Sequence, residues 1–111
     1  MEKIITYKDF TKVDMRIGTI IDVKDFPKAH RPAYQLSIDF GELGIRKSSA
    51  QITTLYKKEA LLHRQIVAVI NFPKKQIANF MSACLVVGAV KANDVYLLHP
   101  ETKVKNGVKV S

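Results

Sequence analysis

Two short apolar runs that enclose a basic segment constrain this fold more than any other feature of the sequence. Residues 65–70 (QIVAVI) and 83–90 (ACLVVGAV) are rich in β-branched residues, too short to span a membrane, and bounded by loop-forming residues. They predict two buried strands. The segment between them opens with Asn-Phe-Pro at 71–73 and carries Lys74 and Lys75. Because loops on rigid sheets commonly carry binding residues, we expect this exposed basic loop to be functional.

The size and charge of the chain limit the class of protein. A chain of 111 residues forms one domain, residues 1–111, and buries roughly two-thirds of its unfolded surface without metal or disulfides. Its 47% hydrophobic and 25% charged residues are typical of a globular protein. The net charge of +8 is large for this length. It favours nucleic acid or another anionic partner, since each phosphate contact releases counterions.

Alternating polarity predicts a barrel of short strands. Besides the two apolar runs, four segments are predicted strands: residues 14–23, 34–40, 45–50 and 94–99. Gly18 inside the first of them predicts a bulge or a tight bend. Helical spacing predicts a helix over residues 52–62, between the third and fourth strands. Five or six strands with a helix at that place predict an all-β OB-fold, a five-stranded Greek-key barrel.

Both ends of the chain extend this barrel. Thr6 followed by Asp9 predicts a capped helix to about Lys12, so that residues 1–13 form an N-terminal helical arm. Residues 94–111 form a C-terminal extension that contains an Asn-Gly turn. The two ends carry more apolar groups than a small barrel needs for itself: Ile4, Ile5, Val95, Leu97 and Val104. We therefore expect both ends to lie at the interface of a homodimer.

Motifs for catalysis and metal binding are missing from the sequence. The three histidines lack zinc-ligand spacing, and no nucleophile elbow, Walker loop or dinucleotide motif occurs. Solvated strand ends explain the acidic pairs Asp22 with Asp25 and Asp39 with Glu42. Cys84, the single cysteine, is expected to be a small buried hydrophobe. We predict a binding protein that is not an enzyme and uses no metal or cofactor.

The N-terminal segment bears on where the protein works. The sequence MEKIITYKDF has charges where a signal peptide needs an apolar core, and no apolar run of 18 residues follows it. We expect a cytoplasmic protein without membrane insertion.

Six motifs are spread along the chain. They are Asp14-x-Arg16-x-Gly18, Phe26-Pro27, Asp39-Phe40-Gly41, Ser48-Ser49-Ala50-Gln51-Ile52-Thr53, Asn71-Phe72-Pro73, and Ile77-Ala78-Asn79-Phe80 with Ser82. From about Phe10 to Val108 the chain thereby resembles the tRNA-binding-domain OB-fold family, and within it most closely the CsaA-type export-related chaperones. The resemblance implies a homodimer and, for the wider family, tRNA binding. For the CsaA type it implies binding of unfolded precursor polypeptides destined for export machinery.

The sequence departs from the family pattern in the basic loop. The family usually has glycine at the position of Asn79, and an acidic and then a small residue at the positions of Ala83 and Cys84. Asparagine tolerates left-handed backbone, so the loop is expected to keep its shape at Asn79. The missing acidic group removes any hydrogen bond that it made. Whether these three residues alter the binding loop stays open at the level of sequence.

RNA is the first candidate ligand for the predicted surface. In an OB-fold groove, cations contact phosphates, polar side chains form hydrogen bonds, and aromatic rings stack on bases. The candidate RNA-binding residues are Arg46, Lys47, Ser49, Lys74, Lys75, Asn79 and Ser82. Phe80 is a candidate stacking face, or else it packs back into the core. RNA bound in this way is recognised largely by shape and 2′-hydroxyls.

Unfolded polypeptide is the second candidate ligand, and the sequence leaves both open. Capture of a polypeptide needs apolar side chains and a free strand edge. The candidate peptide-binding residues are Phe72, Ile77, Phe80 and Met81. Packing in the core or at a dimer interface is the alternative explanation for all four. A module that docks onto a larger synthetase-like partner is a third possibility.

Overall fold

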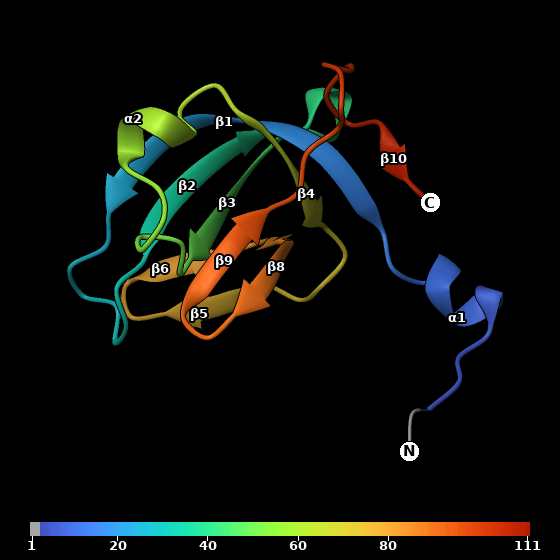
Figure 1. Cartoon of the computed structure of the whole chain (residues 1–111), viewed down its shortest axis with the longest axis horizontal. Coiled ribbons are helices and arrows are strands. Elements are labelled where there is room, and N and C mark those ends of the chain that lie inside the picture. The colour runs from blue at the N-terminus through green and yellow to red at the C-terminus, as the bar shows by residue number, and fades with distance from the viewer. Residues whose placement is uncertain (1–2) are drawn as a thin grey trace.

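The barrel is built around one long central strand. In the computed structural model, which describes residues 3–111, six strands form the main sheet: β1 (Met15–Asp25), β2 (Tyr34–Asp39), β3 (Ile45–Ala50), β4 (Gln65–Val69), β7 (Leu85–Val86) and β10 (Lys109–Val110). Their order is β3-β2-β1-β4-β7, with β10 paired to the start of β1, and all pairings are antiparallel. The sheet curls on itself, as Figure 1 shows.

The alternation predicted for residues 34–40 is confirmed and supplies one wall of the core. Tyr34, Leu36 and Ile38 are buried on the inner face of β2, and Phe40 after it is fully buried. Ile20, Ile66 and Ala68 meet them from β1 and β4, together with Leu61. The inward residues of a half-buried strand recur with period two, which is why the sequence pattern located this strand so well. The three-residue 3₁₀ helix η1 (Gly41–Leu43) then turns the chain into β3.

Gly18 is required by close packing rather than by a bulge. A Cβ atom at this position would lie 2.6 Å from Ile38 Cγ2 and 2.7 Å from the Phe40 ring. The irregularity in the pairing of β1 with β2 falls instead between Ile20 and Asp22. The prediction of a bulge or bend at Gly18 was therefore misplaced by a few residues, because a glycine that admits a neighbouring side chain has the same sequence pattern as one that bends a strand.

The barrel closes between β3 and β7 without a continuous ladder. The amide of Ala83 donates to the Lys47 carbonyl at 2.8 Å, and the buried Ser48 hydroxyl donates to the Cys84 carbonyl at 2.8 Å. These two hydrogen bonds satisfy groups that a twisted sheet would otherwise leave unpaired at the seam.

The two helices match the predictions to different degrees. Helix α1 (Tyr7–Thr11) has the predicted cap, in which the Thr6 hydroxyl accepts from the Asp9 amide and the Asp9 carboxylate accepts from the Thr6 amide, both at 3.1 Å. It projects from one end of the barrel (Figure 1). Helix α2 (Lys58–Leu61) lies between β3 and β4 as expected, but it is much shorter than the predicted 52–62.

Tertiary contacts of Tyr56 explain why α2 begins late. Its carbonyl accepts from the Tyr34 hydroxyl at 2.8 Å, and its own hydroxyl accepts from the Leu97 amide at 3.0 Å. Ile52, at the start of the predicted helix, is buried in the core. These contacts hold the preceding residues on an irregular path, which overrides their helical spacing.

The second apolar run is divided between two sheets. Residues 83–90 were predicted as one strand, whereas β7 pairs with β4 and β8 (Gly88–Lys91) forms a separate hairpin with β9 (Asp94–Leu97). The basic loop is likewise more regular than expected, since β5 (Lys75–Ile77) pairs with β6 (Phe80–Ser82).

Within the described residues, no helix is both long enough and apolar enough to cross a membrane.

Candidate nucleic-acid interface

A surface hollow joins the start of β3 to the basic segment that follows β4. It encloses about 510 Å³, and its lining residues are Leu43, Ile45, Arg46, Lys47, Lys74, Met81 and Ala83. We call it the basic hollow. Three of the predicted RNA-binding residues meet here: Arg46 and Lys47 from β3, and Lys74 from the loop after β4. The basic loop and the exit of the β2–β3 hairpin therefore form one surface.

Among residues 3–111, the three cations of the basic hollow have no acidic partner. The residues that line it include no aspartate or glutamate, and none of the three takes part in an ion pair among residues 3–111. Arg46 is half-buried and donates from Nη1 to the Ile70 carbonyl at 2.9 Å, which holds it against the end of β4. Lys47 and Lys74 are exposed. Uncompensated positive charge in a concave surface attracts anions more strongly than the same charge on a flat one.

Apolar side chains line the other part of the basic hollow. Ile45 is 61% exposed, Met81 48% and Leu43 39%. Met81 was predicted as a binding residue, whereas Leu43 and Ile45 were not. Ile45 shares the outward phase of β3 with Lys47, so the alternation of that strand contained the information needed to find it.

The Ser82 hydroxyl is used in a structural hydrogen bond to the main chain of Ser49. Ser82 is buried, its hydroxyl accepts from the Ser49 amide at 3.1 Å, and it lies 3.4 Å from the Cys84 carbonyl. The hydroxyl predicted to contact RNA thus fixes the β5–β6 hairpin to β3. Lys75 and Asn79 are exposed on the hairpin but do not line the basic hollow.

The four candidate peptide-binding residues are separated by burial. Phe72 is 53% exposed and Met81 48%, whereas Ile77 and Phe80 are half-buried. The Phe80 ring packs on the buried Phe26, with centroids 5.4 Å apart and planes at 59°. This arrangement favours the interpretation that Phe80 packs back onto the barrel.

The departures from the family pattern leave the hairpin intact. The positive φ of its turn, 52°, falls on Ala78 and not on Asn79, so the tolerance of asparagine for left-handed backbone is not what forms the turn. Ala83 and Cys84 close the seam between β3 and β7 through their main-chain groups.

Cys84 is buried, and burial raises the pKa of its thiol to about 11. Such a thiol is a poor nucleophile at neutral pH.

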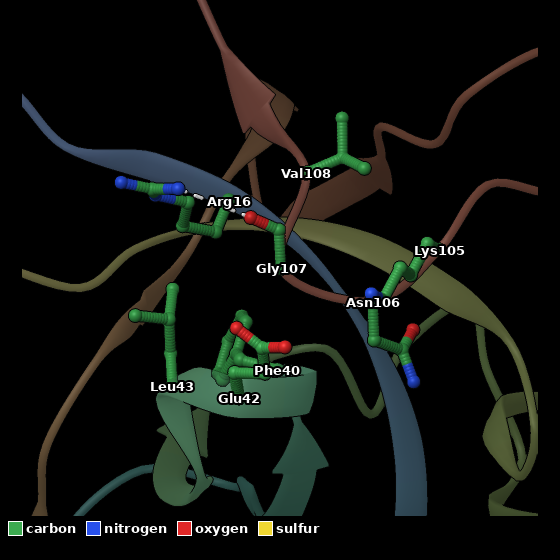
Figure 2. A pocket seen from close by; sticks show the side chains of 8 residues that line it. All are labelled: Arg16, Phe40, Glu42, Leu43, Lys105, Asn106, Gly107 and Val108. Carbon is green, nitrogen blue, oxygen red and sulfur yellow. Dashed lines mark hydrogen bonds between the residues drawn. The ribbon is translucent and has the colours of Figure 1, made fainter.

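A smaller hollow, which shares Leu43 with the basic hollow, joins the barrel to the C-terminal extension (Figure 2). It encloses about 240 Å³ and includes Arg16, Glu42 and Gly107. Arg16 pairs with Asp14 at 2.6 Å and donates to the Gly107 carbonyl at 3.1 Å, so its charge is already compensated. This gives the Asp-x-Arg motif a structural role.

Among residues 3–111 no cluster of three histidine, cysteine or acidic side chains could hold a metal ion.

Comparisons with known proteins agree with this geometry. In structure, the chaperone CsaA of Bacillus anthracis superimposes with a TM-score of 0.94 at 49% identity, over 98% of this chain and 100% of that one. The CsaA chaperone protein of Picrophilus torridus gives 0.91 at 50% identity, over 97% and 100%. These matches confirm the expected OB-type barrel and the resemblance to CsaA proteins.

Sequence relatives include a much larger enzyme. Methionine–tRNA ligase of Pyrococcus abyssi is 37% identical over 109 residues, which are 98% of this chain and 15% of the ligase. The chain therefore spans about 15% of the length of that relative. A family model described as "Putative tRNA binding domain" matches residues 15–109. Since that match covers most of its length, the chain belongs to the tRNA binding domain family.

Proposed function

We propose that this protein binds tRNA without catalysing a reaction on it, and that the basic hollow is the docking surface. The observation that carries this proposal is the meeting of Arg46, Lys47 and Lys74 in one hollow with no acidic lining residue. A phosphate backbone complements such a surface, because neutralising each phosphate releases counterions. Membership of the tRNA binding domain family supports the same ligand. The cytoplasm, where tRNA is present, is the compartment that fits this role.

Shape would dominate recognition in this hollow. The lysines contact phosphates, and the exposed Met81 and Ile45 offer apolar contact to a base or ribose. Lys75 and Asn79 on the β5–β6 hairpin and Ser49 on β3 extend the surface around the hollow. None of these groups forms the fixed bidentate pattern that reads a particular base, so we expect structured RNA to be bound with little sequence preference.

A salt titration of tRNA binding tests this proposal. Lys47→Ala and Lys74→Ala should each weaken binding and lower the slope of log K against log salt by about 0.7–0.9, because each removes one phosphate contact. Lys91→Ala is the matched control, since Lys91 is exposed on the β8–β9 hairpin outside the hollow. Fluorescence anisotropy with labelled tRNA at several ionic strengths gives the slopes. Affinity that is independent of salt, or equal losses for all three variants, would refute the proposal.

Capture of unfolded polypeptide is the second candidate function, with delivery of precursors to export machinery as its role. The exposed Met81, Ile45 and Phe72 favour it, because mobile methionine suits promiscuous apolar binding. The two structures similar to this chain described above are named as chaperones. In this case a reduced, carboxymethylated model polypeptide should displace tRNA at moderate salt. Met81→Ser should weaken binding of the polypeptide while leaving the salt slope of tRNA binding unchanged.

A homodimer would double the docking surface. Ile4 is 97% exposed, Tyr7 76% and Ile5 65%, which is far more apolar exposure than a short arm needs. The C-terminal extension contributes less than expected, because Leu97 is buried in the chain's own core and Val95 packs against it. We therefore assign the larger part of the proposed interface to the described arm, residues 3–13.

A further inference from the structure

A second basic pocket lies where the turn after α2 meets the segment after β9. It encloses about 370 Å³ and is lined by His63, Arg64, Gln65, His99, Pro100 and Lys103. We call it the His63–Lys103 pocket. Four of its six lining residues carry basic side chains and none is acidic. It shares no lining residue with the basic hollow.

A clamp made by Gln65 builds this pocket from two distant segments. The side-chain amide nitrogen of Gln65 donates to the Val104 carbonyl at 2.7 Å, and its oxygen accepts from the Val104 amide at 3.1 Å. These two bonds mimic a backbone pair and fix the C-terminal segment beside the start of β4. Lys103, next to the clamped residue, is therefore held near Arg64.

Main-chain and aromatic contacts position the two residues before the clamp, His63 and Arg64. His63 has a positive φ of 71°, and its amide donates to the Ile20 carbonyl at 2.7 Å. The guanidinium carbon of Arg64 lies 5.3 Å from the centroid of the Tyr56 ring, whose hydroxyl is itself hydrogen-bonded. Among the described residues, no ion pair involves Arg64 or Lys103. The left-handed backbone of His63 directly follows Leu62, the C-cap of α2, and it turns the chain so that Arg64 and Gln65 reach the pocket.

His99 also lines the pocket. Its Nδ1 lies 2.9 Å from the Pro100 carbonyl, which can only accept, so this hydrogen bond requires the proton on Nδ1. Planar guanidinium, ammonium and imidazole groups around one concave space are the donor set that proteins use for phosphate.

We propose that the His63–Lys103 pocket binds a phosphate group of RNA, as an anchor separate from the basic hollow. This inference rests on the proposed RNA-binding function and deepens it. An RNA that reaches both sites would be held in one orientation, because two separated phosphate contacts fix its direction across the barrel. Either a backbone phosphodiester or a terminal phosphate has the required chemistry.

Lys103→Gln tests the pocket, because the side chain is exposed and its loss leaves the fold unchanged. The variant should bind tRNA more weakly and lower the salt slope by about 0.7–0.9. Lys105→Gln, two residues further on and outside the pocket, is the matched control and should leave the slope unchanged. An equal slope for Lys103→Gln and wild type would overturn the proposal. Arg64→Gln should act in the same direction, with circular dichroism as the check on folding.

One further measurement identifies which phosphate the pocket binds. Another distinguishes failure of the pocket proposal from failure of the proposed tRNA-binding function. If removal of the tRNA 5′-phosphate abolishes the difference between Lys103→Gln and wild type, the anchor holds that terminal phosphate; if the difference persists, it holds the backbone. If wild type binds no tRNA, the proposed function fails by itself. Titration with inorganic pyrophosphate then tests the pocket, and it should shift the ring resonances of His63 and His99 in NMR spectra of wild type but not of Arg64→Gln. Absence of shifts in wild type overturns the proposal.

Discussion

At the scale of single residues, Gly18 shows how tightly the barrel is packed. Alanine at this position would place Cβ 2.6 Å from Ile38 Cγ2 and 2.7 Å from the Phe40 ring, and both neighbours are fully buried. Overpacking of this kind costs about 1–3 kcal/mol. We therefore expect Gly18→Ala to lower the free energy of unfolding by this amount, as measured by urea denaturation. An unchanged midpoint would show that the core yields more easily than these contacts indicate.

Cys84 gives a second test at this scale. Burial raises the pKa of its thiol to about 11, from an ordinary value of 9.0. The folded state therefore retains the thiol proton more strongly than the unfolded state. The protonated thiol thus contributes to the free energy of unfolding in full below pH 9, and this contribution is lost as the pH rises towards 11. At pH 8 the folded protein should react with iodoacetamide far more slowly than the protein in urea, as followed by mass spectrometry. Equal rates would mean that the seam at Cys84 opens freely.

The residue types of the site were predictable, but their partners were not. Lys47 and Lys74 were expected to share one surface, and both line the basic hollow. Lys47 lies within the predicted strand 45–50, and Lys74 lies in the loop after the predicted strand 65–70. Ser82 was predicted to face the ligand, whereas its partner is the amide of Ser49, 33 positions earlier. Nothing in the local pattern distinguishes a hydroxyl that meets a ligand from one that meets a distant strand.

At the scale of elements, alternation located strands well and left their pairing undetermined. β3 has the predicted bounds, 45–50, and β2 agrees to within one residue. The run 83–90 was predicted as one strand because apolar character does not show which sheet each residue joins. The predicted helix over 52–62 was too long, since contacts of Tyr56 outweigh a weak helical preference.

The seam between β3 and β7 is the element-scale feature most open to test. Ser48→Ala removes the shorter of two hydroxyl contacts to the Cys84 carbonyl and leaves only the Ser82 hydroxyl, at 3.4 Å. Loss of one such hydrogen bond costs about 0.5–1.5 kcal/mol. We expect faster hydrogen exchange at the Ala83 amide together with a lower unfolding midpoint. Ser37→Ala, at a half-buried position of β2, is the control, and equal effects of the two substitutions would argue against a special role for the seam.

At the scale of the whole molecule, the exposed arm predicts self-association. Wild type should sediment as a dimer at micromolar concentration, and Ile4→Asp with Ile5→Asp should give a monomer, because buried carboxylates without partners are costly. Leu55→Asp is the control, an exposed apolar residue between β3 and α2. A monomeric wild type would remove the dimer and leave the barrel and its hollows unaffected.

Five arginine and lysine side chains line two concave sites on one barrel: Arg46, Lys47 and Lys74 in the basic hollow, and Arg64 and Lys103 in the His63–Lys103 pocket. We propose that a single tRNA contacts the start of β3 and the segment after β4 at the same time. Lysine acetylation followed by mass spectrometry, with and without saturating tRNA, tests this most directly. We predict that Lys47 and Lys74 are both protected by tRNA while Lys91 reacts as before. Equal acetylation of Lys47 and Lys74 in the presence and absence of tRNA would contradict the claim.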